Sequence, residues 1–140
     1  MARQYRHTFL RNIGNTLIEA ALKLGVGPGG LHLLTVTGRK SGREYTTPVN
    51  LVYRDDQSYL VAPYGEVSWV RNARPAGEVS LRRGRKVVTR RIQELPAAEA
   101  LTVLGDYWHQ NAITRPFFEG RPDDPAFQRD AVRHPVFRLL

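Results

Sequence analysis

The chain contains no cysteine among its 140 residues. Disulfide scaffolds, thiolate metal sites and thiol nucleophiles are therefore excluded. No stretch approaches the roughly 20 apolar residues that a membrane-spanning helix needs. The N-terminus also lacks the uninterrupted apolar segment and small-residue cleavage site of a secretory signal peptide. We therefore expect a cytoplasmic protein.

Motifs that mark several catalytic classes are also absent. The four histidines are scattered and form no pair at metal-ligand spacing, so the sequence predicts no metal site. No Gly-x-Ser-x-Gly elbow is present, which argues against a serine hydrolase. The glycines around Lys40 lack the Gly-Lys-Ser/Thr of a P-loop, and Gly25–Gly30, which fits G-x-G-x-x-G, follows a predicted helix rather than a strand. An enzymatic function therefore needs a cofactor that supplies the chemistry.

Positive charge is in clear excess, with a formal net charge of +8. Between Arg71 and Arg91 there are eight cations and one acidic residue, Glu78. Such a field favours an anionic partner: nucleic acid, an anionic membrane surface or a small polyanionic cofactor. Aromatic side chains do not alternate with these arginines as a stacking platform for nucleic acid requires, so we expect no nucleic-acid partner.

A cationic turn between two apolar segments is the most informative local feature. The β-branched and apolar character of Leu33–Thr37 and Tyr45–Tyr53 predicts two strands. Between them, glycines flank Arg39, Lys40 and Ser41. Glycines let backbone N–H groups approach a ligand, and two cations with a hydroxyl suit a phosphate. A solvated basic hairpin tip is the alternative.

The remaining periodicities predict a small antiparallel barrel with appended helices, an α+β fold. Pro48 lies inside the second strand, so that strand should be an edge or carry a bulge there. We expect one domain, with the barrel at about residues 31–94 and C-terminal helices and a tail at 96–140. Further predicted strands are Tyr59–Ala62, Glu78–Arg82 and Lys86–Gln93, and predicted helices are residues 3–24, Glu66–Ala73, Ala97–Gln110 and Pro125–Arg133.

The predicted N-terminal helix is both basic and amphipathic. Phe9, Ile13 and Leu17 recur at three- and four-residue steps, with arginines elsewhere. A helix of this kind covers a core in most proteins and lies on a membrane surface in others. Peripheral membrane contact through this helix therefore stays open, as does the oligomeric state.

Two motifs together resemble the deazaflavin-dependent nitroreductase family. They are residues 34–50, LTVTGRKSGREYTTPVN, and, after the next strand, residues 68–72, SWVRN. The similarity extends from about Gly27 to Glu94, and the HPVFR segment at residues 134–138 is similar to one branch of the family. Members are split β-barrel oxidoreductases that use 8-hydroxy-5-deazaflavin (coenzyme F420), a flavin analogue with a phosphate and an oligoglutamate tail. The resemblance thus implies a pyridoxamine-oxidase-like split β-barrel.

The resemblance also implies a set of cofactor-binding residues. Three would hold the phosphate, five would line the ring, four would border the ring from the next strand, and four would come from the short helix that follows. In that order they are Arg39, Lys40 and Ser41; Thr46, Thr47, Pro48, Val49 and Asn50; Val61, Ala62, Pro63 and Tyr64; and Ser68, Trp69, Arg71 and Asn72. A polyanionic cofactor would account for both the basic turn and the second basic cluster.

The implied activity is hydride transfer from reduced deazaflavin to a small acceptor such as a quinone, an enone or a nitroaromatic. Pro63 and Tyr64 depart from the Ser-Lys pair that many family members have there. An FMN-binding reductase and a non-catalytic carrier of a fatty acid or other amphiphile remain alternatives. No catalytic residue is assigned. Candidates for the acceptor wall, which could equally be core residues, are Tyr107, Trp108, Phe117 and Phe118.

Overall fold

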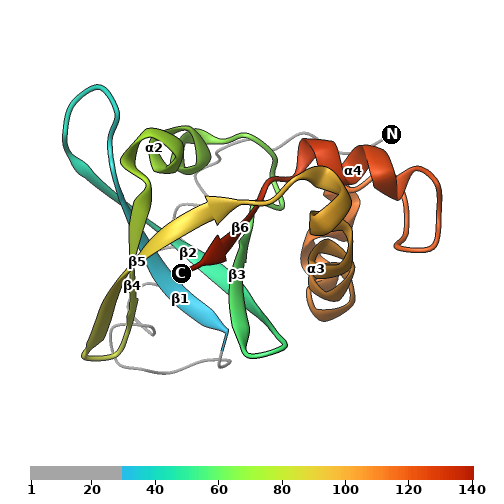
Figure 1. The fold of residues 1–140 in the computed structure, drawn as a ribbon, viewed down its shortest axis with the longest axis horizontal. Coiled ribbons are helices and arrows are strands. Elements are labelled where there is room, and N and C mark those ends of the chain that lie inside the picture. The colour runs from blue at the N-terminus through green and yellow to red at the C-terminus, as the bar shows by residue number, and fades with distance from the viewer. Residues whose placement is uncertain (1–29) are drawn as a thin grey trace.

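The computed structural model describes residues 30–140 of the chain. The predicted helix at residues 3–24 lies outside these described residues. The strands are β1 (Leu31–Thr37), β2 (Glu44–Arg54), β3 (Gln57–Val61), β4 (Glu78–Arg83), β5 (Lys86–Glu94) and β6 (Val136–Leu139). The helices are α2 (Ser68–Ala76), α3 (Ala97–Gln110), the short 3-10 helix η1 (Ala112–Phe117) and α4 (Phe127–Arg133). Figure 1 shows them in place.

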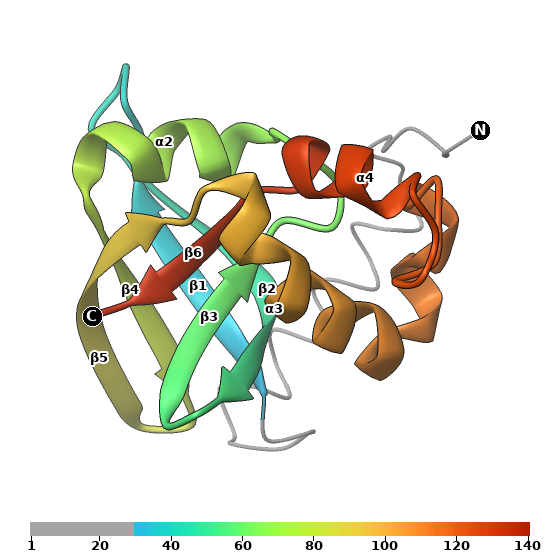
Figure 2. The same cartoon turned by 45° about the vertical axis from the view of Figure 1, so that its right-hand side comes forward.

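The strands form a closed antiparallel barrel in the order β1-β2-β3-β6-β5-β4. The C-terminal strand β6 lies between β3 and β5, where Val61 pairs with Val136 and Ile92 pairs with Leu139. The chain thus closes its barrel with its last strand, as Figures 1 and 2 show. The predicted split β-barrel of mostly antiparallel strands with flanking helices is confirmed.

Two apolar clusters hold the helices against the barrel. Inward-facing side chains such as Leu34, Leu60 and Phe137 fill the barrel, and α2 adds Val70 to the same cluster. A second cluster joins α3 and α4 to the outer side of the barrel; its members include Val52, Val61, Leu104, Phe127 and Val136. Figure 2 shows α3 and α4 on one side of the barrel, with α2 across one end. No helix of residues 30–140 is long and apolar enough to cross a membrane.

The end of α2 differs from its prediction. The sequence predicts that Pro75 and Gly77 stop a helix at Ala73, but α2 continues to Ala76 and includes the proline in its last turn. Of the two predicted stops, Gly77 ends the helix: it adopts φ = 70°, and its N–H donates to the carbonyl of Ala73. A left-handed glycine satisfies the last carbonyls of a helix more directly than a proline can.

The prediction for Pro48 is confirmed. Residues 44–50 of β2 pair with β1, and residues 51–54 pair with β3. Pro48 therefore has a paired strand on one side alone, through Leu33, and its missing N–H interrupts no ladder on the other side.

Candidate functional site

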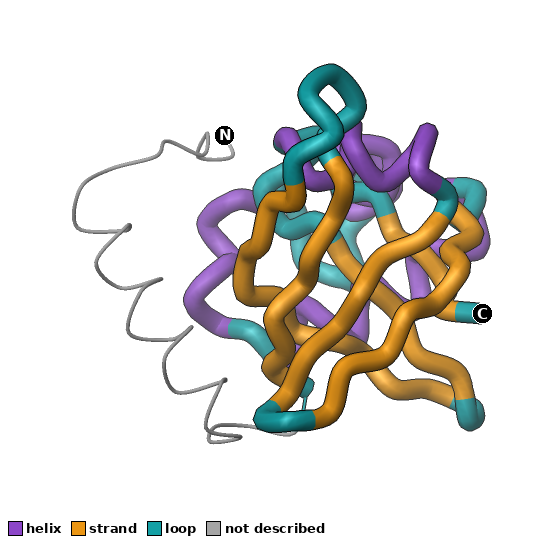
Figure 3. Tube along the Cα trace, turned by 90° about the vertical axis from the view of Figure 1, so that its left-hand side faces the viewer, coloured by secondary structure: helices purple, strands orange, loops and turns teal. Residues whose placement is uncertain are grey.

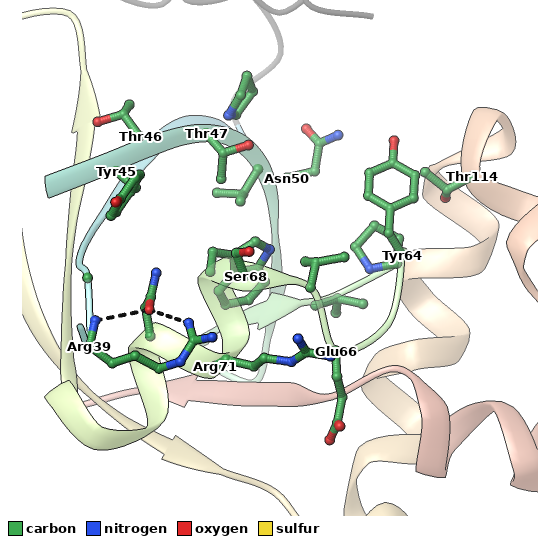
Figure 4. A pocket seen from close by; sticks show the side chains of 18 of the residues that line it. Arg39, Tyr45, Thr46, Thr47, Asn50, Tyr64, Glu66, Ser68, Arg71 and Thr114 are labelled. Atoms are coloured by element: carbon green, nitrogen blue, oxygen red, sulfur yellow. Dashed lines mark hydrogen bonds between the residues drawn. The ribbon is translucent and has the colours of Figure 1, made fainter. Parts of the chain in front are cut away.

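A cavity of about 890 Å³ lies between the β1–β2 turn, α2 and the α3–η1 region. Fifteen of the sixteen residues implied by the resemblance line this cavity, although they come from β2, β3, two connecting segments and a helix. Figure 4 shows side chains from these separate elements pointing toward one space. The fold thus gathers the expected residues around one cavity.

Ala62 is the exception: it does not line the cavity. Val61 and Pro63 line the cavity, but Ala62 is fully buried between them. Its N–H donates to the carbonyl of Pro135, and its own carbonyl lies 3.2 Å from His134 Nδ1. Successive residues of an extended segment face opposite sides, so Ala62 faces the C-terminal segment while its neighbours face the cavity.

The β1–β2 turn forms the cationic end of the cavity. Its Gly38 N–H donates to the carbonyl of Arg43 at 2.6 Å, which closes the turn. A Cβ on Gly38 would lie 2.6 Å from the Tyr45 ring, so a larger residue would force the Tyr45 side chain to shift. Arg39 is fixed to α2, because Asn72 Oδ1 accepts hydrogen bonds from its backbone N–H (3.1 Å) and from its Nη1 (2.6 Å). Among residues 30–140 the other guanidinium donors of Arg39 have no acceptor, and they are suited to bind an anionic ligand.

Helix α2 brings polar and aromatic side chains to the cavity. Its buried face, Val70 and Ala73, packs into the barrel core. The first turn therefore places Ser68 and Trp69 along the cavity, and Arg71 follows them. The Trp69 ring lies 5.9 Å from that of Phe137 and is tilted by 53°. One face of α2 thus supplies a hydroxyl, an aromatic ring and a cation to the cavity.

The opposite end of the cavity is aromatic and carries few charges. Tyr64 contacts the ring of Phe117 edge-on at 4.8 Å, and Asn50 donates from Nδ2 to Asn111 Oδ1 at 3.0 Å. Burial raises the pKa of Tyr107 to about 12, although a hydrogen bond with Thr114 opposes the shift. Tyr107 is therefore a neutral hydroxyl at physiological pH.

The four aromatic candidates for the acceptor wall have different positions. Tyr107 lines the cavity. Trp108, on α3, and Phe118 belong to the core cluster that joins α3 and α4 to the barrel. The guanidinium of Arg115 lies 4.1 Å from the centre of the Trp108 ring. Phe117 is buried, and its ring contacts that of Tyr64, which lines the cavity. For Trp108 and Phe118 the core alternative holds.

The basic cluster of residues 71–91 does not act as one surface. Arg71 lines the cavity. Arg74 is paired with Glu66 and Glu94, each at 2.8 Å. Other cations, Arg83, Lys86 and Arg90, line a separate cavity of about 470 Å³. It includes the β4–β5 turn, at the end of the barrel away from the β1–β2 turn (Figure 3). A polyanion bound at the β1–β2 turn would therefore share its cavity with Arg71, whereas Arg83, Lys86 and Arg90 line the other cavity.

Several lining residues were not predicted. They are Leu31, Gly38, Tyr45, Glu66, Val67 and Thr114. Gly38 and Tyr45 lie within the motif at residues 34–50, so both carried a local signal in the sequence. Thr114 follows α3 and carries no motif, so no sequence signal placed it here. Among residues 30–140, no group of three or more His, Asp or Glu is arranged to hold a metal.

The cavity fits an elongated, anionic, ring-bearing cofactor. Its volume lies within the range of about 300–1,000 Å³ typical of cofactor sites. Arg39, Lys40 and Arg71 give one part of the cavity a positive charge. The one carboxylate among the lining residues, Glu66, is paired with Arg74. Its repulsion of a bound anion is therefore weaker than that of an unpaired carboxylate. Aromatic and amide groups at the other end suit a planar heterocycle.

Comparisons with solved structures agree with this fold. An F420-H2-dependent reductase, FDR-A, is 24% identical with a TM-score of 0.59, over 82% of this chain and 97% of that chain. A structure described as a domain-swapped dimer is 23% identical (TM-score 0.57), over 94% and 97%. A protein from Bacteroides thetaiotaomicron, titled a putative 5-nitroimidazole antibiotic resistance protein, is 15% identical (TM-score 0.55), over 89% and 77%. These identities establish the fold alone.

Family membership comes from the sequence. A comparison with curated proteins gives no significant match. The model of the family described as F420H(2)-dependent quinone reductase matches residues 5–116, most of the chain. The family's cofactor is coenzyme F420, as the resemblance implied. The chain therefore belongs to the F420H(2)-dependent quinone reductase family and is an F420-dependent oxidoreductase.

Proposed function

We propose that the cavity binds reduced F420 with its phosphate at the β1–β2 turn and its ring toward Asn50 and Tyr64, and that a small planar acceptor takes the hydride there. The observation that carries this proposal is the polarity of the cavity: cations gather at Arg39, Lys40 and Arg71, and aromatic and amide groups gather at the other end. A phosphate and a heterocycle joined by a flexible chain match that order.

The protein's contribution is positioning and electrostatics. The bound cofactor supplies the hydride. Arg39, held by Asn72, and Lys40 are placed to fix the anionic end, while Trp69 and Tyr64 confine the ring. Tyr107 and Thr114 border the remaining space, where the acceptor would lie. We propose a quinone as the acceptor, in agreement with the family's description, with enones and nitroaromatics as further substrates.

A fluorescence titration tests the cofactor site. We expect F420 to bind with micromolar or lower Kd, and Lys40→Ala to weaken binding roughly tenfold, the effect of one lost charge-assisted contact. Lys86→Ala is the matched control, since Lys86 is equally exposed but lies at the other end of the barrel. A similar loss in both variants would show that binding follows net charge and not this site.

Turnover tests the acceptor. Reduced F420 mixed with menadione should regain the absorbance of oxidised deazaflavin only when the protein is present. Binding of F420 without transfer to a quinone, an enone or a nitroaromatic would contradict the proposed reaction. Binding of FMN in place of F420, or a co-purified fatty acid in the cavity, would support the two alternatives instead.

A further inference from the structure

Two amide side chains connect the ring end of the cavity to helix α3. Asn50 Nδ2 donates to Asn111 Oδ1 at 3.0 Å. Asn111 Nδ2 in turn donates to the backbone carbonyl of Tyr107, also at 3.0 Å. Asn111 follows the last residue of α3, and its backbone N–H also donates to Tyr107. The pair joins residues 61 positions apart in the sequence.

The backbone carbonyl fixes the direction of both hydrogen bonds. A carbonyl only accepts, so the atom that Asn111 turns toward Tyr107 must be its nitrogen. The oxygen of Asn111 then faces Asn50 and accepts a hydrogen bond, so the donor must be the side-chain nitrogen of Asn50. The oxygen and nitrogen of an amide side chain are ordinarily hard to tell apart. In this relay, from the Tyr107 carbonyl through Asn111 to Asn50, the backbone carbonyl allows one orientation of each amide.

The two hydrogen bonds fix the orientation of the Asn50 amide. Asn50 is half-buried and lines the cavity. Its nitrogen is directed to the α3 side, where Thr114 also lies, and its oxygen lies on the other side of the amide (Figure 4). Within residues 30–140, this oxygen has no hydrogen-bond partner in the structure, and it is not among the buried atoms that lack one.

We infer that Asn50 Oδ1 accepts a hydrogen bond from the imide N–H of the deazaflavin pyrimidine ring, and that Asn111 is the positioning residue that keeps this oxygen turned toward the ligand. The inference rests on the proposed function, since it needs the ring at this end of the cavity. The imide N–H is the one ring donor that lies between two carbonyl groups. A quinone carries no N–H or O–H and so cannot satisfy an acceptor at this position.

Binding of F420 and of its derivative methylated at the imide nitrogen provides the test. Methylation should weaken binding to the wild type roughly tenfold, because it removes a donor and leaves Asn50 Oδ1 unpaired. In Asn50→Leu, which has a similar shape and no acceptor, methylation should change Kd by about twofold or less. The double-mutant cycle isolates this pair from other effects of the methyl group.

Asn111→Leu tests the positioning role separately. It leaves Asn50 in place but frees its amide to rotate, so the penalty for methylation should fall between those of the wild type and Asn50→Leu. Gln93→Leu, a change in an amide on the outer side of β5, is the control and should keep the wild-type penalty. Circular dichroism of each variant verifies folding.

Each outcome has one meaning. An equal methylation penalty in the wild type and Asn50→Leu would overturn the assignment of Asn50. A wild-type penalty in Asn111→Leu would overturn the positioning role of Asn111. Failure of unmodified F420 to bind the wild type would instead contradict the proposed cofactor site.

Discussion

At the scale of single residues, Asn72 is the side chain on which the cationic end of the cavity depends. It lies on α2, 33 positions from Arg39, and is only 5% exposed. One oxygen accepts from both the backbone and the guanidinium of Arg39. The β1–β2 turn is therefore held to α2 by a single amide, and the direction of Arg39 follows from that contact.

Replacing Asn72 by alanine should affect both stability and binding. We expect the free energy of unfolding to fall by about 1–2 kcal/mol, because the Arg39 N–H loses its partner. Kd for F420 should rise severalfold, because Arg39 is no longer fixed. Urea unfolding and fluorescence titration measure the two effects. Gln93→Ala, which removes an exposed amide bonded to Arg138, should change neither. Unchanged affinity in Asn72→Ala would show that Arg39 does not contact the cofactor.

At the scale of elements, α2 and α3 make opposite use of glycine. Gly77 ends α2 with φ = 70°, and a Cβ there would meet nothing within 4 Å. Gly105 lies inside α3, where a Cβ would make ordinary contact with Pro122 at 3.7 Å. Space is sufficient at both positions, so backbone conformation alone decides the effect of a substitution.

The two alanine variants should therefore shift stability in opposite directions. Gly77→Ala should lower the free energy of unfolding by about 1 kcal/mol, because an L-residue is strained at positive φ. Gly105→Ala should raise it by about 0.5–1 kcal/mol, because alanine loses less backbone entropy in a helix. Thermal unfolding of the two variants and the wild type measures both changes. A destabilised Gly105→Ala would mean that α3 cannot accommodate the methyl group against Pro122.

At the scale of the whole molecule, the C-terminal segment closes the barrel. Strand β6 completes the ring between β3 and β5. His134, just before β6, lies 3.2 Å from the carbonyl of Ala62 and 3.7 Å from Asp130. Asp130 is fully buried and accepts from the N–H groups of Glu119 and Gly120. One buried pair thus joins α4, the loop before it and the end of β3.

Stability should depend on pH through His134. Burial lowers the pKa of this imidazole from its usual 6.5, against the opposing effects of the Ala62 carbonyl and Asp130. The unfolded chain therefore binds a proton at a higher pH than the folded chain does. The stability contributed by the neutral ring is present above pH 6.5 and is lost as pH falls from 6.5 through the folded-state pKa.

The variant His134→Gln keeps an N–H donor but does not titrate. Its urea midpoint should decline less steeply than that of the wild type between pH 7 and pH 5. Urea unfolding at intervals across this range makes the comparison. Identical pH profiles would show that His134 does not contribute to the acid sensitivity of the fold.

Local features of this protein were determined by the sequence alone. The boundaries of α3 agree with its pattern of apolar residues, and the strands on both sides of the glycine-flanked turn agree within two residues at each end. Helical and extended periodicities depend on neighbouring residues, so they are visible without a fold. The cationic turn and the motif at residues 68–72 identified the family for the same reason, since each lies within one short segment.

The tertiary structure decided what depends on contacts between distant segments. The tertiary structure placed β6 between β3 and β5 in the barrel wall. It also brought Thr114 to the cavity that β2 lines, and Asn111 into hydrogen-bonding contact with Asn50. It also separated Arg71 from Lys86, which the sequence counts as one basic cluster, and turned Ala62 away from the cavity. These outcomes depend on which side chains face each other across the closed barrel. The spacing of residues along the chain does not predict such contacts.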